Sequence, residues 1–259
     1  ESIALKKTWE RFSRNLFRKG LSSELMRAHI RENAREFKSK KFWVLDETDI
    51  SKAYAQAMEG LGSVWDGSNG EKGTGYWVVN VAGISTRDDS ISLMYSELFS
   101  LDHEQEKGMS SNKKITLSIS TLRNELKVNR PVVIDRGGDS RKIIEDFIEN
   151  KQQFIIRQRG DRHIYDGRKR IELKSYAKEI SCSHEIIVKK KRHGKYRHIK
   201  FYGGARRVWF PKEYSPKVFP TALWLIRLTR QQGKAESWYL CYIPVKTERE
   251  AVEMVVEGY

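Results

Sequence analysis

Residues 130–157 read RPVVIDRGGDSRKIIEDFIENKQQFIIR, and this stretch decides the fold class that the sequence predicts. Arg130-Pro-Val-Val-Ile-Asp135 is a short apolar run that ends in an acid, as buried strands often do. Arg136-Gly-Gly138 makes a turn, and helical spacing then continues to Asn150. Phe154-Ile-Ile156 predicts the next strand. A strand, a helix and a strand in this order predict parallel neighbours in a mixed α/β sheet.

The residues upstream predict more of the same sheet. Phe42-Trp-Val-Leu-Asp46 is a second apolar run that ends in an acid, and strand-like residues follow at 76–82 and 90–99. Strands separated by tight turns favour an antiparallel meander. We expect the turns at 66–70 and 72–75, and helices over 51–61 and 112–128.

The ends of the chain have a helical pattern. Trp9, Phe12 and Leu16 share one helical face, and Leu25 and Ile30 belong to a second stripe. The sequence thus predicts four parts: a helical segment over 1–41 that ends in a basic linker at 38–41, an α/β core over 42–161, a basic β-rich insertion over 162–244, and the start of a C-terminal helix over 245–259.

Positive charge is concentrated in one segment of the chain. The formal charge is +15, and between Lys151 and Lys212 there are 19 Lys or Arg against 5 Asp or Glu, a net of +14. Such an excess attracts a polyanion, and nucleic acid is the first candidate. A solvated basic face or an anionic membrane surface is the alternative, although a membrane surface favours a basic amphipathic helix. The segment instead predicts antiparallel strands at 186–188, 199–202, 207–210, 222–228 and 238–243, with hairpin turns at 193–194 and 232–233.

Two aspartates, Asp46 and Asp135, each end an apolar strand. If both strands lie in one sheet, their carboxylates meet at one edge, where ligands bind in open α/β sheets. An oxygen-only pair suits Mg²⁺ or Mn²⁺, and two such ions can activate a water or a 3′ hydroxyl for phosphoryl transfer. The alternative is that both aspartates merely cap turns.

A family resemblance adds to this interpretation. Val44-Leu-Asp-Glu-Thr-Asp-Ile-Ser-Lys52 resembles the first acidic motif of the DDE transposases of bacterial insertion sequences. Val132-Val-Ile-Asp-Arg-Gly-Gly-Asp-Ser-Arg141 resembles their second motif. The resemblance spans residues 42–259 and includes smaller matches at 58–61, 66–67, 75–76, 154–157 and 159–162.

The resemblance implies an RNase H-like fold of the retroviral-integrase superfamily: a mixed sheet flanked by helices, with an inserted, mainly antiparallel β subdomain. Three acids of this family hold two divalent metal ions that serve DNA cleavage and strand transfer. Asp46 matches the first acid and Asp135 the second. Asp49 falls on the opposite face of an extended strand, and Asp139 is expected to cap the helix that follows.

The third acid belongs to a helical signature: Tyr, two residues, Arg, three residues, Glu, six residues, Lys. Tyr259 stands where the tyrosine is expected, so we expect the chain to be a fragment cut before its third acid. The alternative is that a glutamate of the last helix substitutes, although none stands at the signature spacing; the four are Glu248, Glu250, Glu253 and Glu257.

The basic strands match the β-rich insertion of some family members, which implies DNA as the partner, both transposon ends and target. The residues expected to contact phosphates are Lys189, Lys190, Lys191, Arg192, Lys195, Arg197, Lys200, Arg206 and Arg207. The aromatic residues among them favour a core role, with stacking on an exposed base as the alternative; these are Tyr196, Phe201, Tyr202, Trp209 and Phe210.

The setting follows from the same features. Two distant cysteines, Cys182 and Cys241, indicate a reducing compartment. The alternative is a single disulfide bond between them. No apolar run is long enough to span a membrane. The family resemblance implies a cytoplasmic, nucleoid-associated bacterial protein. The resemblance implies a homodimer on paired ends. The rival functions are a non-catalytic DNA-binding remnant of a transposase and a nuclease of the same fold without joining activity.

Overall fold

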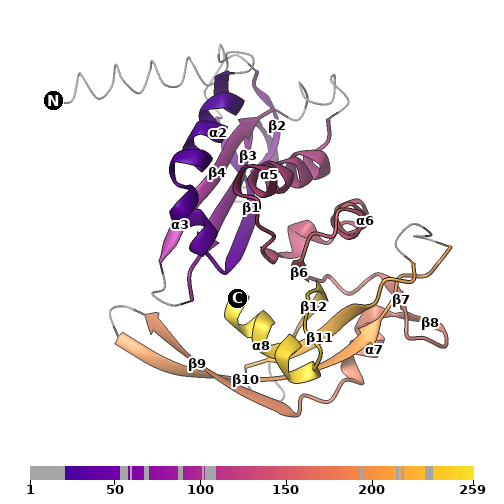
Figure 1. The fold of residues 1–259 in the computed structure, drawn as a ribbon. Helices are drawn as coiled ribbons and strands as arrows, with labels where there is room; N and C mark the ends of the chain where they lie inside the picture. Colours follow the sequence, from indigo (N-terminus) through magenta and orange to yellow (C-terminus); the bar gives the residue numbers. More distant parts are fainter. Residues whose placement is uncertain are drawn as a thin grey trace.

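The computed structural model describes most of the chain from residue 21 onward (Figure 1). The described ranges are 21–52, 58, 60–66, 70–86, 90–100, 102, 109–192, 195–213, 216, 219–230 and 236–259. The helix expected around Trp9 and the hairpin turns expected at 193–194 and 232–233 lie outside them. Among the described helices, none is long and apolar enough to cross a membrane.

The first strands form the expected antiparallel meander. β3 (Glu71–Ile84) pairs with β1 (Phe42–Ser51) and with β4 (Ile91–Phe99), and it also pairs with β2 (Gly62–Asp66). The turn expected at 72–75 is wrong, because these residues lie inside β3. Its glycine serves a close approach instead, since a Cβ atom at Gly75 would lie 2.1 Å from the carbonyl oxygen of Ile50.

The second half of the core is parallel, as predicted. β1 pairs with β5 (Val132–Ile134), and β5 pairs with β6 (Phe154–Arg157), both in parallel. α5 (Ser111–Leu126) leads from β4 into β5, and α6 (Arg141–Glu149) lies between β5 and β6. A mixed α/β sheet flanked by helices is therefore confirmed.

The basic segment continues this sheet. β12 (Glu236–Tyr242) pairs antiparallel with β6, and the order then runs through β11 (Leu223–Thr229) and β10 (Lys195–Val208) to β9 (His184–Arg192). The result is a ten-stranded sheet, so sheet pairing crosses the boundary expected at residue 162. The four-part division of the chain stays a prediction.

Three local features of the basic segment differ from the predictions. The two strands expected at 199–202 and 207–210 are one long strand, β10. A small two-stranded sheet precedes it, made of β7 (His163–Tyr165) and β8 (Arg170–Glu172). A short helix, α7 (Leu173–Lys178), follows β8 and was not predicted.

Helices cover both faces of the sheet. On one face, α5 and α6 bury Ile119 and Ile144 in a cluster with Trp43 of β1. On the other face, α8 (Glu248–Gly258) buries Val252 and Val255 in a second cluster. In Figure 1, α8 lies across the sheet between the core strands and the long β9–β10 hairpin. Alternate residues of each strand therefore belong to different cores.

The described residues before β1, from Leu21 to Ser39, are mostly helical. α2 (Leu21–Glu32) and α3 (Ala34–Ser39) confirm the second predicted helical stripe. The basic linker expected at 38–41 is wrong, because Lys40 is only 2% exposed. Its Nζ donates to Ser90 Oγ over 2.9 Å and lies 3.4 Å from a carboxylate oxygen of Glu36, so its charge is held inside the fold.

A candidate carboxylate site between two parallel strands

The two predicted acids stand side by side in the sheet. Leu45 of β1 pairs with Ile134 of β5, and this is the last pair of their parallel register. Asp46 and Asp135 are the next residue on each strand. Because neighbouring strands lie roughly 4.8 Å apart, the register brings the two backbones together at this point. The pair is therefore a neighbouring pair, as the sequence expected.

Both acids belong to the face of the sheet that α8 covers. Phe42 and Val133 are buried in the cluster under α8. Asp46 is four residues after Phe42 and Asp135 is two residues after Val133, so strand alternation places them on the same face. Both aspartates are exposed, and the side chain of Asp135 is 62% accessible.

The setting of Asp46 differs from the prediction in one respect. The expected strand ends at Asp46, whereas β1 continues to Ser51. The extension follows from β3, which pairs with β1 as far as Ser51 and Gly75. β5 stops at Ile134, so Asp135 marks the end of its strand while Asp46 lies within one.

Arg157 is a site residue that the sequence analysis missed. Ile134 pairs with Ile156 of β6, so Arg157 follows Asp135 in the same row across the sheet. One guanidinium nitrogen of Arg157 lies 3.3 Å from a carboxylate oxygen of Asp135, and the other donates to Ser237 Oγ over 3.2 Å. The sequence did contain a signal for Arg157, which is a basic residue at the end of the apolar run Phe154-Ile-Ile156. The sequence analysis used this residue only as part of the family resemblance.

Tyr259 brings the end of α8 to the same place. Its hydroxyl donates to the carbonyl oxygen of Ile134 over 2.5 Å, and its ring lies 4.7 Å from that of Tyr239. Burial, with the neighbouring Tyr239 hydroxyl and Asp135 carboxylate, raises the pKa of the Tyr259 hydroxyl well above its usual range. The tyrosine of the expected signature is therefore anchored directly beside Asp135.

The glutamates of α8 have partners elsewhere. Glu250 closes a capping box with Thr247 at the start of the helix. The backbone N–H groups of Lys246 and Thr247 lower the pKa of its carboxyl. The ion pairs of the other three are Glu248 with His184, Glu253 with Arg249, and Glu257 with Lys41.

Two other carboxylates near the pair, those of Glu47 and Asp139, have structural contacts of their own. Glu47 lies on the opposite face, where its carboxylate accepts from Ser111 Oγ. Burial and the nearby Asp46 raise the pKa of the Glu47 carboxyl. The hydrogen bond from Ser111 makes this carboxyl part of the contact between β1 and α5. Asp139 is not the helix cap that was predicted. Its carboxylate accepts from the backbone N–H of Arg159 over 2.7 Å and from Nε of Arg162 over 3.0 Å.

Asp46 and Asp135 are the side chains at this site that could hold a divalent cation. Within the described part of the chain, no group of three or more Asp, Glu, His or Cys side chains is placed to hold a metal ion. Two carboxylates are the smaller kind of ligand set. Mg²⁺ is commonly bound by one or two carboxylates, with water and substrate phosphate oxygens completing its shell.

The predicted DNA-contact residues do not form one surface. Arg207 stacks on Trp224 at 3.8 Å, under α8, whereas Arg206 lies over Tyr176 of α7 on the other face. Lys200 pairs with Glu185 at 3.1 Å, and this contact raises the pKa of the lysine.

The outer part of the β9–β10 hairpin is more open to solvent. Lys189 and Arg197 are exposed, and Lys189 lies over the ring of Tyr196 at 4.4 Å. The backbones of the remaining predicted contacts lie in β9 and β10, but their side chains are outside the described parts; these are Lys190, Lys191, Arg192 and Lys195.

Two of the five aromatic residues of the basic segment belong to the buried cores, Phe201 and Phe210. Tyr202 and Trp209 are partly buried, and Tyr196 is exposed. The core role preferred for most of these residues is therefore confirmed for Phe201 and Phe210. The two cysteines, Cys182 and Cys241, are free thiols.

Comparisons with known proteins give little more. No protein-family model and no curated protein matches the sequence. Among solved structures, the chain is similar to the NurA nuclease from Sulfolobus solfataricus, with 10% sequence identity and a TM-score of 0.37, over 97% of this chain and 85% of that chain. A likeness this weak transfers neither fold family nor activity.

Proposed function

We propose that this chain is the catalytic region of a DDE transposase with an RNase H-like fold, which cleaves DNA and joins DNA strands with the help of divalent metal ions. One observation carries the proposal: Asp46 and Asp135 follow directly on register-paired residues of two parallel strands and share one face. Two unrelated turn-capping aspartates have no reason to meet in this way. The sequence resemblance selects the transposase among metal-dependent DNA enzymes.

The chain's own residues suit this chemistry. Asp46 and Asp135 provide oxygen ligands at the open end of β5. A bound Mg²⁺ or Mn²⁺ polarises a phosphoryl oxygen and lowers the pKa of an attacking water or hydroxyl. Arg157 neutralises Asp135 in the free protein and, once released, can face a DNA phosphate with a planar fork of donors. DNA is the proposed partner, and a homodimer on paired transposon ends stays a prediction.

The third acid also stays a prediction. The resemblance places it on the helix whose tyrosine is Tyr259. The hydrogen bond from Tyr259 to Ile134 supports this, because it ties that tyrosine to the residue just before Asp135.

The test is a cleavage and joining assay on the full protein that carries this sequence. With labelled transposon-end DNA and Mg²⁺ or Mn²⁺, Asp46→Asn and Asp135→Asn are each expected to lower the cleavage rate at least about 100-fold, because each removes a metal ligand. Asp49→Asn is the matched control, since it removes the same charge from the opposite face of β1. Its rate should stay close to that of the unaltered protein.

The rival functions correspond to other results of the same assay. Cleavage that depends on both acids but gives no joined product indicates a nuclease. DNA binding without metal-dependent cleavage indicates the non-catalytic remnant, which is favoured by the pairing of Asp135 with Arg157. If Asp46→Asn, Asp135→Asn and Asp49→Asn all cleave DNA at the same rate, Asp46 and Asp135 do not form the catalytic site.

A further inference from the structure

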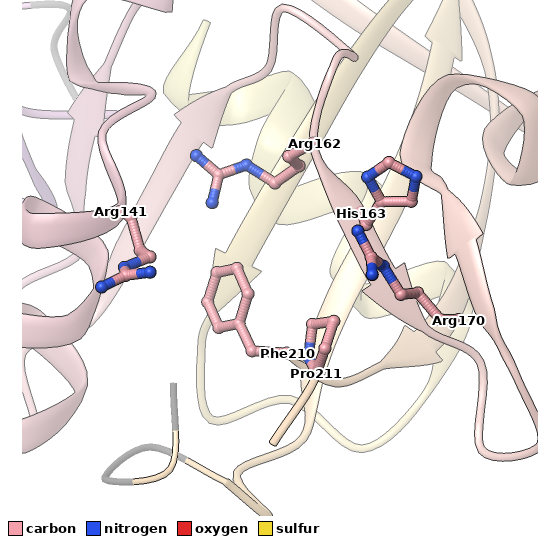
Figure 2. Close-up of a pocket in the computed structure, with 6 residues that line it drawn as sticks. All are labelled: Arg141, Arg162, His163, Arg170, Phe210 and Pro211. Carbon is pink, nitrogen blue, oxygen red and sulfur yellow. The ribbon is translucent and has the colours of Figure 1, made fainter. Parts of the chain in front are cut away.

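A basic pocket lies beyond the turn that follows Asp135. It has a volume of about 280 Å³ and is formed by the start of α6, the β7–β8 hairpin and the end of the β10 segment. Figure 2 shows side chains from these three places gathered around one space. The lining residues are Arg141, Arg162, His163, Arg170, Phe210 and Pro211, and none of them was among the residues predicted to contact phosphates.

The pocket wall combines positive charge with an apolar floor. Among the described residues that line it, none is acidic. Arg162 is held in place by Asp139 and lies over the ring of Phe210 at 5.4 Å, so it acts as a fixed wall. Arg141 is more open to solvent, because its side chain is 56% exposed. It also pairs with Glu145, one helical turn further along α6, at 3.3 Å.

We infer that this pocket binds a phosphate group of a nucleotide, and that its source is the DNA strand that reaches the carboxylate site. Arginine forks match phosphate oxygens bidentately, and the pocket presents arginines over a buried apolar floor. Arg162 bonds to Asp139, which closes the turn that starts at Asp135, so the pocket and the site share one rigid segment. The DNA source rests on the proposed function; the phosphate chemistry does not.

The experiment measures binding without catalysis. The anisotropy of a fluorescent single-stranded oligonucleotide is titrated with the protein in EDTA at several salt concentrations. Arg141→Ala is expected to weaken binding roughly fivefold or more and to lower the salt slope by about 1, as loss of one phosphate contact does. Lys142→Ala is the matched control, because Lys142 is the next exposed cation on α6 but does not line the pocket.

Competitors identify the source of the phosphate. Inorganic phosphate and thymidine monophosphate are added to the unaltered protein and to Arg141→Ala. Competition that disappears in Arg141→Ala supports a pocket for free phosphate or a mononucleotide. Oligonucleotide binding that resists both competitors but falls in Arg141→Ala supports the polynucleotide backbone as the ligand.

The inference is overturned if Arg141→Ala and Lys142→Ala weaken oligonucleotide binding equally, because the positive charge of α6 then acts without a specific pocket. It is also overturned if neither substitution changes binding. A second variant, Arg170→Ala, repeats the test from the β8 side of the pocket. Because EDTA prevents cleavage, the two proposals fail separately. A protein that binds through Arg141 but never cleaves DNA keeps this inference and loses the proposed function, and a protein that cleaves without using Arg141 does the reverse.

Discussion

Asp139 shows how one residue can mislead local sequence reasoning. It stands just before a helix, where an acid is a common cap, yet its side chain is only 1% exposed and bonds to Arg159 and Arg162. The residues it contacts lie more than one helix and one strand further along the chain. Its role is to join the turn after Asp135 to the basic segment.

This pairing predicts a large loss of stability on substitution. Asp139→Ala leaves the largely buried guanidinium of Arg162 without its partner, and breaking such a pair costs about 3 kcal/mol of the free energy of unfolding. Urea denaturation followed by fluorescence measures the loss. Asp161→Ala removes an exposed acid nearby and should change stability by less than about 0.5 kcal/mol. Similar losses in both variants would contradict a structural role for Asp139.

Arg157 leads to a prediction about metal affinity. Its guanidinium competes for a carboxylate oxygen of Asp135, and an exposed pair of this kind contributes up to about 1 kcal/mol. Arg157→Met should therefore tighten Mn²⁺ binding roughly three- to fivefold in the absence of DNA. Calorimetric titration measures this change. Arg159→Met removes the same charge two residues along, and an equal gain there would show that only the overall charge matters.

At the scale of elements, the strands were predicted better than the turns between them. The apolar cores of β1, β3, β5 and β6 follow from local periodicity. The prediction of a turn at 72–75 was wrong. A glycine can serve either a tight turn or the close approach of another backbone, and the sequence alone does not distinguish these two roles. Gly75 is small because the backbone of Ile50 passes against it, which is a tertiary cause.

Two glycines on the same face of β3 test this explanation. Gly75→Ala places a methyl group against the carbonyl oxygen of Ile50 and should lower stability by about 1–3 kcal/mol. Gly73→Ala meets its nearest atom, Ser51 Oγ, at an ordinary 3.6 Å and should change stability much less. The midpoint of thermal unfolding compares the two. A greater loss at Gly73 would show that the β1–β3 contact does not limit the size of residue 75.

At the scale of the whole molecule, the basic segment is joined to the core. β12 pairs with β6, and α8 packs on strands from both halves. The cluster under α8 unites Val133 and Ile155 of the core with Phe201 and Trp224 of the basic segment. Neither half buries this face alone.

This shared core predicts that the first half does not fold alone. A fragment of residues 21–161 exposes the edge of β6 and the apolar face that α8 covers. It should aggregate or show the dispersed, mobile side chains of a collapsed state in NMR spectra. A soluble fragment with a cooperative unfolding transition would instead establish residue 162 as a domain boundary.

The sequence by itself determined most strands and helices of the core, though not β2, as well as the two acids that end apolar runs and the concentration of charge after Lys151. These features are local, because they depend on the periodicity and composition of short segments. The tertiary structure alone decided that Asp46 and Asp135 directly follow a register pair of two parallel strands, that Arg157 and Tyr259 lie beside Asp135, and that the basic strands extend the same sheet. It also divided the predicted DNA contacts between two faces and gathered Arg141 and Arg170 into one pocket. The physical reason is that strand pairing and side-chain contacts join residues far apart in the chain, and neighbouring sequence does not specify which distant residues will meet.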